Sequence, residues 1–339
     1  MRAYRCPRCQ TLLDLSAWTC DRCGAPVGFA LEPGVVLELD ATTGSLWVRC
    51  AGSGGTPCNW LVPRGGNARC ESCRLTRTVP GGDDPDDLAH LWALEGGKRR
   101  LVYQLHDLGL PIVDRVADPE RGLCFDLLSS RMGPVIIGHA NGVITIDLSE
   151  SDDAHRAMLK AQLDEPYRTV VGHLRHEIGH YYWDVLVDRG GHLEAFRALF
   201  GDERASYQEA LDRHYREGAP RGWELDRVSA YATMHPWEDW AETFAHYLHI
   251  RDTLQTAAAW GIVVGGPVGD PSPQPGVVPM DDVDDREFSA VADDWARFTA
   301  GLNAVNRSMG HGDLYPFDLT RPVIVKMAFV HDLVRAPGS

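Results

Sequence analysis

The stretch HLRHEIGHYYWD, residues 173–184, decides which fold this chain is expected to adopt. It lies within a helical pattern, VVGHLRHEIGHYYWDVLV, for which Pro166 suits the first turn and Gly190-Gly191 suits the end. The same sequence is also compatible with a buried helix whose histidines form hydrogen bonds and bind no metal. The question is therefore whether these histidines bind a metal ion, and a third ligand elsewhere in the chain would answer it.

The histidines of this stretch have the spacing of metal ligands. His176 and His180 are four residues apart, so both imidazoles lie on one face of the helix and can reach one zinc ion. Glu177 is rotated about 100° from His176 and lies beside that ion, where it can hold a water molecule. The pattern HExxH thus offers two zinc ligands and a general base.

A third ligand is predicted in SAYATMHPWEDWAETFAHYLHI, residues 229–250, where Pro236 marks a helix start. Glu238 and Glu242 lie one turn apart on one face of that helix. Glu238 can complete the zinc shell, and Glu242 can accept a hydrogen bond from a zinc-bound histidine. Asp239 is the less favoured ligand because it points away from this face.

Small residues predict that the two helices approach each other closely. Ala241 and Ala245 lie near the face that carries the two glutamates, and the HExxH helix offers Gly179. The surrounding letters are mostly apolar or aromatic, so this second helix is expected to be buried on several sides.

HEIGH followed by a downstream E-x-x-A-E helix resembles the gluzincin metallopeptidases. The resemblance implies that His176, His180 and Glu238 bind a catalytic zinc ion and that Glu242 supports a histidine. A catalytic tyrosine lies seven residues before the ligand in a member of that group, and Tyr231 has this offset here. The chain departs from better-known gluzincins in the 57 residues between His180 and Glu238.

The likeness is closer to a bacterial family of zinc-binding metallopeptidases with an N-terminal zinc ribbon. It extends over CNWLVP, CRLTRT, HANGVITIDL and WEDWAETFAHYLH. The expected fold is therefore α+β: a mostly helical, zincin-like metallopeptidase domain with a small sheet, preceded by a small β-rich zinc-ribbon module.

Eight of the nine cysteines fall into two groups before residue 74. The first group consists of two CxxC turns. The second group has one CxxC turn and a pair of cysteines with a wider sequence spacing, joined by a loop that contains Gly and Pro. Four thiolates complete a tetrahedral zinc shell, so each group is predicted to hold one structural zinc ion. The groups are Cys6, Cys9, Cys20 and Cys23, and Cys50, Cys58, Cys70 and Cys73; Cys124 is expected in the core.

The acidic, turn-rich segment PGGDDPDD, residues 80–87, predicts a boundary between a zinc-ribbon module at 1–80 and a metallopeptidase domain at 85–339. Residues 263–280 form a Pro/Gly-rich loop within the second domain. Alternation in residues 143–148 predicts a strand after a turn at Ala140-Asn141-Gly142. We interpret this strand as a sheet edge on which an extended substrate could pair.

Composition narrows the classes of partner. The net charge of −15 disfavours nucleic acid, and no apolar run is long enough to span a membrane. The N-terminus lacks the apolar core of a signal peptide, so a cytoplasmic protein is expected. The sequence fixes no oligomeric state.

The predicted reaction is hydrolysis of a peptide or protein by a zinc-activated water, with Glu177 as general base. Tyr231 would donate to the oxyanion, with Tyr182 and His235 as rivals for that role. Two alternatives stay open: an amidase or other zinc hydrolase acting on a non-protein substrate, and a non-catalytic zinc-stabilised binding protein. His173, His139 and His246 are expected to be ordinary core or surface residues, and Asp184, one turn past His180, either supports a metal ligand or faces solvent.

Overall fold

The structure is a computed structural model that describes residues 2–39, 46–52, 55–82, 84–163, 169–265, 277 and 283–336, without the side chains of 159–163 and 284. The described chain divides into two compact units. The N-terminal unit contains residues 3–159 and 169–174, and the C-terminal unit contains the chain from Arg175 onward. The two units are described separately below.

The cysteine-rich part of the N-terminal unit is built from short strands. One antiparallel pair joins β1 (Tyr4–Arg5) to β2 (Leu12–Leu13). A four-stranded sheet has the order β4-β3-β6-β5, in which β3 and β6 run parallel and the outer pairs run antiparallel. Its strands are β3 (Val27–Ala30), β4 (Val35–Glu38), β5 (Trp47–Arg49) and β6 (Trp60–Pro63), and α2 (Glu71–Arg74) follows them.

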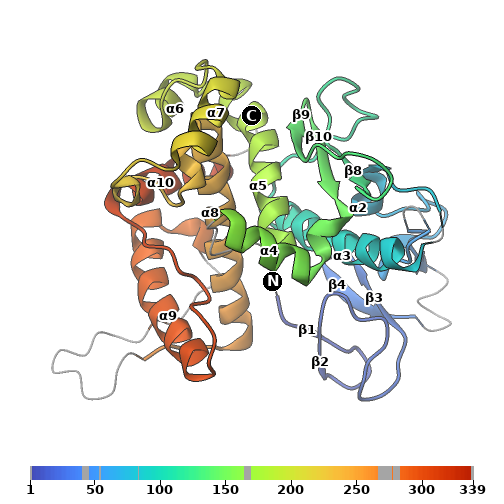
Figure 1. Ribbon diagram of the computed structural model, residues 1–339. Helices are drawn as coiled ribbons and strands as arrows, with labels where there is room; N and C mark the ends of the chain where they lie inside the picture. Colours follow the sequence, from blue (N-terminus) through green and yellow to red (C-terminus); the bar gives the residue numbers. More distant parts are fainter. Residues whose placement is uncertain are drawn as a thin grey trace. The chain divides into compact units, whose positions relative to one another are not determined.

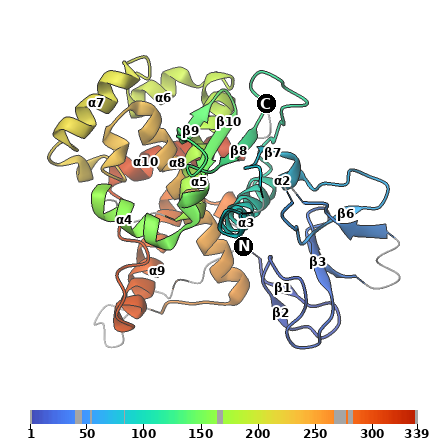
Figure 2. The same ribbon diagram turned by 45° about the vertical axis from the view of Figure 1, so that its right-hand side comes forward.

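Helix α3 (Pro85–Asp107) joins this ribbon to a second sheet within the same unit (Figure 2). Asp84 caps the helix by accepting hydrogen bonds from the backbone N–H groups of Asp86 and Asp87, and Pro85 occupies the first turn. On one side Tyr103 packs edge-on against Phe29 of β3, with ring centroids 5.6 Å apart. Elsewhere on the helix, buried Lys98 lies over the Phe125 ring of β8.

The second sheet has the order β7-β8-β10-β9 and contains the strand predicted at 143–148. Strand β10 pairs in parallel with β8 and antiparallel with β9. Asn141 and Gly142 both have positive φ, as a two-residue hairpin turn requires, so the predicted turn is confirmed. The strands are β7 (Thr76–Thr78), β8 (Cys124–Leu128), β9 (Gly138–Ala140) and β10 (Val143–Asp147), followed by η1 (Leu148–Ser151) and α4 (Asp153–Leu163).

The prediction that residues 143–148 form a sheet edge is wrong. Strand β8 pairs along the whole of β10, and β9 pairs with its first three residues, so the edge strand is the short β9. The alternation in the sequence reports which side chains of β10 are buried, and a strand inside a sheet can show the same alternation.

The C-terminal unit is helical and is organised around the long helix α8 (Pro236–Trp260), which α6 and α10 contact (Figure 1). Fully buried Trp240, Phe244 and Tyr247 give α8 its core face. The other elements are α5 (Val170–Tyr182), which begins in the N-terminal unit, the π-helical turn η2 (Trp183–Asp188), α6 (Leu193–Phe200), α7 (Tyr207–Glu217), η3 (Trp223–Leu225), η4 (Tyr231–Thr233), η5 (Val283–Asp285), α9 (Phe288–Ser308) and α10 (Arg321–Arg335).

The fold is α+β, with small sheets and a helical second unit, as predicted. Pro166 and most of the 263–280 loop lie outside the described residues; Val264 and Val277 form an antiparallel bridge. The domain boundary at 80–85 stays a prediction. Among the described helices none is long and apolar enough to cross a membrane.

Candidate metal centre

The centre is built where α5 passes close to α8 in the C-terminal unit. A Cβ atom placed on Gly179 would lie only 3.0 Å from the Cα of Ala241, so the backbones approach as the small residues predicted. The indole of Trp240 donates a hydrogen bond to the carbonyl of Gly179 at 2.8 Å. Close packing therefore fixes the spacing of the two helices beside the histidines.

Three predicted ligands converge at this crossing. The Nε2 atoms of His176 and His180 are 3.3 Å apart, and Glu238 Oε2 lies 3.0 Å from the first and 3.5 Å from the second. Zn–N and Zn–O bonds of about 2.0–2.1 Å in a tetrahedron separate neighbouring ligand atoms by about 3.3 Å. The triangle therefore has the size that a zinc ion requires.

The burial of the third ligand atom, Oε2 of Glu238, is best explained by a cation beside it. Glu238 is 1% exposed, and its buried Oε2 accepts no well-aligned hydrogen bond from the described residues, although the two imidazole nitrogens lie 3.0 and 3.5 Å away. Burial raises the pKa of Glu238, but the two histidines outweigh this and hold it well below its usual range. Burial likewise lowers the pKa of His176, whereas Glu238 and Glu242 raise it well above its usual value. The surroundings thus favour positive charge at the point where the three side chains meet.

Glu242 fixes the orientation of one of these histidines. Its Oε1 accepts a hydrogen bond from Nδ1 of His176 at 2.6 Å, which leaves Nε2 facing the other two ligand atoms. The hydroxyl of Ser229 donates to Oε2 of Glu242, also at 2.6 Å. This chain of contacts is the arrangement that supports metal-bound histidines in proteins.

Tyr207 is a contact that the sequence did not reveal. Its hydroxyl donates to Oε1 of Glu238 at 2.9 Å, so both carboxylate oxygens have distinct tasks. Burial raises the pKa of Tyr207, and the charge of Glu238 raises it further. No motif links Tyr207, the first residue of α7, to a glutamate on α8, which is why spacing gave no signal.

Glu177 and Tyr231 both lie close to the centre. Glu177 is 5% exposed, and its charge helps to raise the pKa of both Tyr231 and Tyr207. Burial is the largest cause for Tyr231, whose ring centroid lies 5.8 Å from that of His176. A tyrosine with a raised pKa keeps its proton and can donate a hydrogen bond.

The two rivals of Tyr231 occupy other positions. Tyr182 is fully buried and stacks on Phe244 with ring centroids 5.5 Å apart. His235 caps α8: its Nδ1 accepts from the backbone N–H of Trp237, and its Nε2 contacts the carbonyl of Ala205 at 3.1 Å. Both ring nitrogens of His235 contact the backbone, so the ring caps the start of α8 and its nitrogens are occupied by these contacts.

The remaining candidates have ordinary partners. His173 lies 3.2 Å from Glu150, and Nε2 of His139 accepts from the backbone N–H of Gly142 within its hairpin. His246 contacts the hydroxyl of Tyr315 at 2.7 Å.

Two carboxylates near the centre lie in ion pairs. Asp184 pairs with Arg189 at 2.9 Å. Asp239 is buried and pairs with Lys326 at 2.7 Å and with Arg227 at 3.1 Å. Asp239 therefore belongs to an ion-pair network with α10 and the loop after η3, apart from the three converging ligand atoms.

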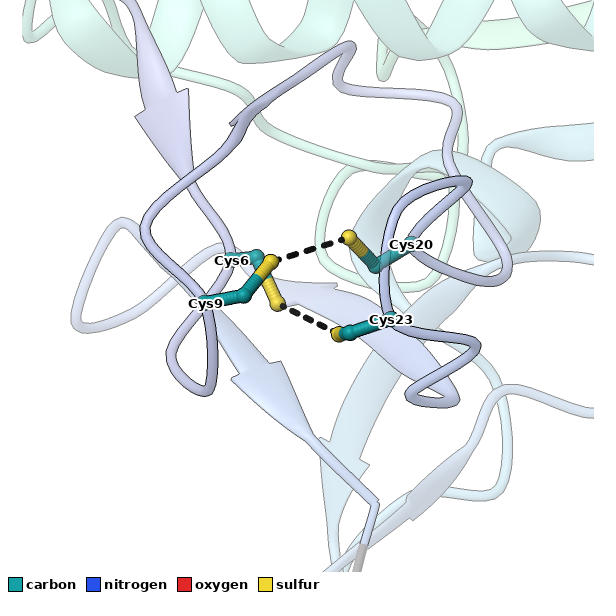
Figure 3. A group of neighbouring side chains, drawn as sticks. All are labelled: Cys6, Cys9, Cys20 and Cys23. Atoms are coloured by element: carbon teal, nitrogen blue, oxygen red, sulfur yellow. Dashed lines mark hydrogen bonds between the residues drawn. The ribbon is translucent and has the colours of Figure 1, made fainter.

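The first cysteine group lies in the N-terminal unit, where four sulfur atoms point toward one another from two turns (Figure 3). The backbone N–H of Gln10 bonds to the carbonyl of Cys6, and that of Gly24 bonds to the carbonyl of Cys20. Each CxxC segment is therefore a tight turn that aims two thiols at one point.

The second group closes around a loop that doubles back, as predicted. Gly52 has positive φ, and a Cβ there would lie 1.9 Å from the carbonyl oxygen of Thr56. Only glycine fits this position. The backbone N–H groups of Gly52 and Cys70 donate to the sulfur of Cys50 at 3.3 and 3.1 Å, which suits a thiolate.

Sulfur separations distinguish metal sites from disulfides. The distances are 3.7 Å for Cys6–Cys23, 3.5 Å for Cys9–Cys20 and 3.9 Å for Cys58–Cys70. Four Zn–S bonds of about 2.3 Å place neighbouring sulfurs about 3.8 Å apart, whereas a disulfide needs about 2.0 Å. Both groups fit zinc, and Cys124 lies buried outside them.

These features define the class as zinc-binding proteins with an N-terminal zinc ribbon. The chain belongs to the family described as "Putative zinc-binding metallo-peptidase", which matches residues 88–333. A zinc-ribbon domain family matches residues 3–84.

Similar proteins occur in mycobacteria. The chain is 47% identical over 338 residues to "Uncharacterized protein Rv2568c" of Mycobacterium tuberculosis (strain ATCC 25618 / H37Rv), covering 98% of this chain and 95% of the relative. The same figures hold for "Uncharacterized protein Mb2598c" of Mycobacterium bovis. No solved structure matches the chain.

Proposed function

We propose that the chain is a zinc-dependent peptidase whose reaction takes place at His176, His180 and Glu238. The observation that carries the proposal is the triangle of ligand atoms, with sides of 3.0, 3.3 and 3.5 Å, formed by two helices far apart in the sequence. Three protein ligands leave the fourth position of a tetrahedral ion open, as catalytic zinc sites do. When bound, zinc would supply Lewis acidity toward the substrate carbonyl and lower the pKa of a water to about 7.

The residues around the triangle have separate tasks. Glu177 accepts the proton of the attacking water and delivers it to the leaving amine. The hydroxyl of Tyr231, kept protonated by burial, donates to the oxygen on which negative charge develops. Glu242 holds the His176 ring in one tautomer, and Tyr207 holds the outer oxygen of Glu238.

Zinc has a different role in the N-terminal unit. Each cysteine group offers four ligands and no open position, so its ion would stabilise the ribbon. We infer three zinc ions per chain, one catalytic and two structural. Clustered cysteine thiolates persist in a reducing compartment, which supports a cytoplasmic location.

Peptides or proteins are the substrates that we propose, because the family is described as a metallopeptidase family. A purely structural centre would not need a buried glutamate beside the ligands, so Glu177 argues against a non-catalytic binding protein. The net charge of −15 argues against nucleic acid as a partner.

The test compares the zinc-replete wild type with a His176→Ala/His180→Ala double variant. Elemental analysis should give about three zinc ions per chain in the wild type and about two in the variant, by the ligand counts above. Mass spectrometry of a mixed peptide pool should show new cleavage products with the wild type only. An equal zinc count in both proteins, or equal cleavage by both, would contradict the proposal.

A further inference from the structure

A cavity of about 320 Å³ lies within the N-terminal unit, between the zinc ribbon and helix α3. This volume is at the small end of the range for ligand pockets, roughly 300–1,000 Å³. The ribbon contributes residues 15–16 and 59–60, α3 contributes Gly96, Arg99 and Arg100, and the first turn of α5 contributes Val170 and Val171. The reaction proposed above uses none of these residues.

Arg99 is the unusual member of this wall. It is 5% exposed, yet no residue that the structure describes gives it a hydrogen bond or an oppositely charged carboxylate partner. Its neighbours on α3 differ: Lys98 pairs with Glu95 at 3.0 Å, and Arg100 lies 3.4 Å from Asp14. A largely buried guanidinium without a hydrogen-bond acceptor is costly, so an acceptor, most favourably an anion, is expected beside it.

The missing side chain at Gly96 opens the wall next to that guanidinium. A Cβ on Gly96 would lie 3.8 Å from Nη2 of Arg99, which is ordinary contact. Gly97 is different, because a Cβ there would lie 2.8 Å from Val170. Packing explains Gly97 but does not require Gly96, although glycine weakens a helix interior.

Trp60 of β6 also lines the wall, although its indole nitrogen is itself covered. Trp60 is 1% exposed, and its indole N–H has no acceptor among the described residues. The rest of the wall combines apolar Leu15, Val170 and Val171 with polar Ser16, Asn59 and Arg100. A guanidinium beside apolar surface suits a small anion attached to an apolar group.

The second cysteine group lies close enough to Arg99 to attract its positive charge, as a bound anion would. The guanidinium interacts electrostatically with the Cys58 thiolate. A single sulfur atom, however, does not offer the two oxygens with which a carboxylate pairs with a guanidinium. The electrostatic contact thus leaves the hydrogen-bonding capacity of Arg99 unused.

We propose that this cavity binds a carboxylate carried on an apolar group, namely the C-terminal residue of a peptide. Arg99 receives the carboxylate, and the surfaces of Leu15, Val170 and Val171 receive the apolar side chain. The ribbon unit therefore carries a peptide-binding site of its own, which does not depend on the catalytic zinc.

The experiment titrates the zinc-replete full-length protein with N-acetyl-leucine and with its neutral counterpart N-acetyl-leucinamide, followed by NMR. N-acetyl-leucine should bind with a dissociation constant in the millimolar range, and the amide at least tenfold more weakly. Arg99→Met should weaken binding of N-acetyl-leucine at least tenfold. Gly96→Leu, which fills the cavity but keeps the charge and suits a helix, should do the same.

Zinc content is measured in every variant. Equal binding of the acid and the amide would overturn the proposal, and so would wild-type binding by Gly96→Leu. Loss of one zinc ion from Arg99→Met, together with unchanged binding in Gly96→Leu, would show that Arg99 serves only the cysteine group. Tighter binding of inorganic phosphate than of N-acetyl-leucine would also contradict a carboxylate site.

Discussion

The cysteine groups and the His–His–Glu centre, all proposed above to bind zinc, bring their ligands together in different ways. In each cysteine group all four ligands come from turns within a span of 24 residues or fewer, and backbone N–H groups support the sulfurs. In the other centre the ligands come from two helices with 57 residues between His180 and Glu238. Side chains from still other segments, Ser229 and Tyr207, support it.

Under the proposed function, this difference separates sites that stabilise the fold from the site of the reaction. A closed shell of four thiolates contributes directly to folding of a segment whose core is too small to be stable alone. A shell of three ligands leaves one position open, and packed helices must hold its geometry. The following predictions test this contrast, from the largest expected effect to the smallest.

Replacing Cys20 with Ser should remove one zinc ion and unfold the surrounding ribbon, because binding of a structural zinc is worth on the order of 10 kcal/mol. Limited proteolysis should then cut within residues 3–39, and the zinc count should fall by one. Cys124→Ser is the control, since Cys124 lies outside both groups and should leave the zinc count unchanged. Loss of zinc from the His–His–Glu centre in Cys20→Ser would contradict the separation between the cysteine sites and that centre.

Replacing Glu177 with Gln should lower kcat about 10³-fold, equivalent to about 4 kcal/mol, because the side chain no longer accepts a proton. The amide keeps the size of the side chain, so zinc content should stay at the wild-type value. Initial rates on a peptide identified in the cleavage screen provide the measurement. Full activity in this variant would remove Glu177 from the reaction.

Replacing Tyr207 with Phe should lower metal affinity at the His–His–Glu centre by about 10–100-fold, because the outer oxygen of Glu238 loses its hydrogen bond. Competition with a chelator gives the affinity, and the cysteine sites should be unaffected. Tyr215→Phe is the matched control, since Tyr215 is on the same helix and is 66% exposed. Equal affinities in both variants would show that Tyr207 does not position the ligand.

Replacing Gly179 with Ala should destabilise the protein by about 1 kcal/mol, because crowding against Ala241 outweighs the better helix propensity. Gly96→Ala should have the opposite sign, a gain of about 0.5–1 kcal/mol, because its Cβ meets only ordinary contact. Thermal unfolding of both variants measures the difference. A stabilised Gly179→Ala would mean that the helix crossing is looser than the structure shows.

Local spacing carried much of the information about the metal sites. In CxxC turns and in HExxH, a few neighbouring residues set the backbone geometry, and this geometry positions the ligands. These sequence motifs therefore predict where the ligand side chains lie. The pairing of Glu238 and Glu242 on one helix face belongs to the same kind of evidence. The assignment of Glu238 also used the resemblance to gluzincins, because 57 residues separate it from His180.

Tertiary structure decided the contacts that no spacing encodes. Tyr207 and Ser229 reach the glutamates of α8 from other segments, and β9 turns a predicted edge strand into an inner one. Arg99 and Arg100 show the same limit of sequence-based prediction. The sequence does not indicate that Arg99 is the buried one, without a carboxylate partner, whereas Arg100 lies near Asp14. The sequence determined the ligand sets through short-range geometry, whereas packing between distant segments determined their orientation and burial.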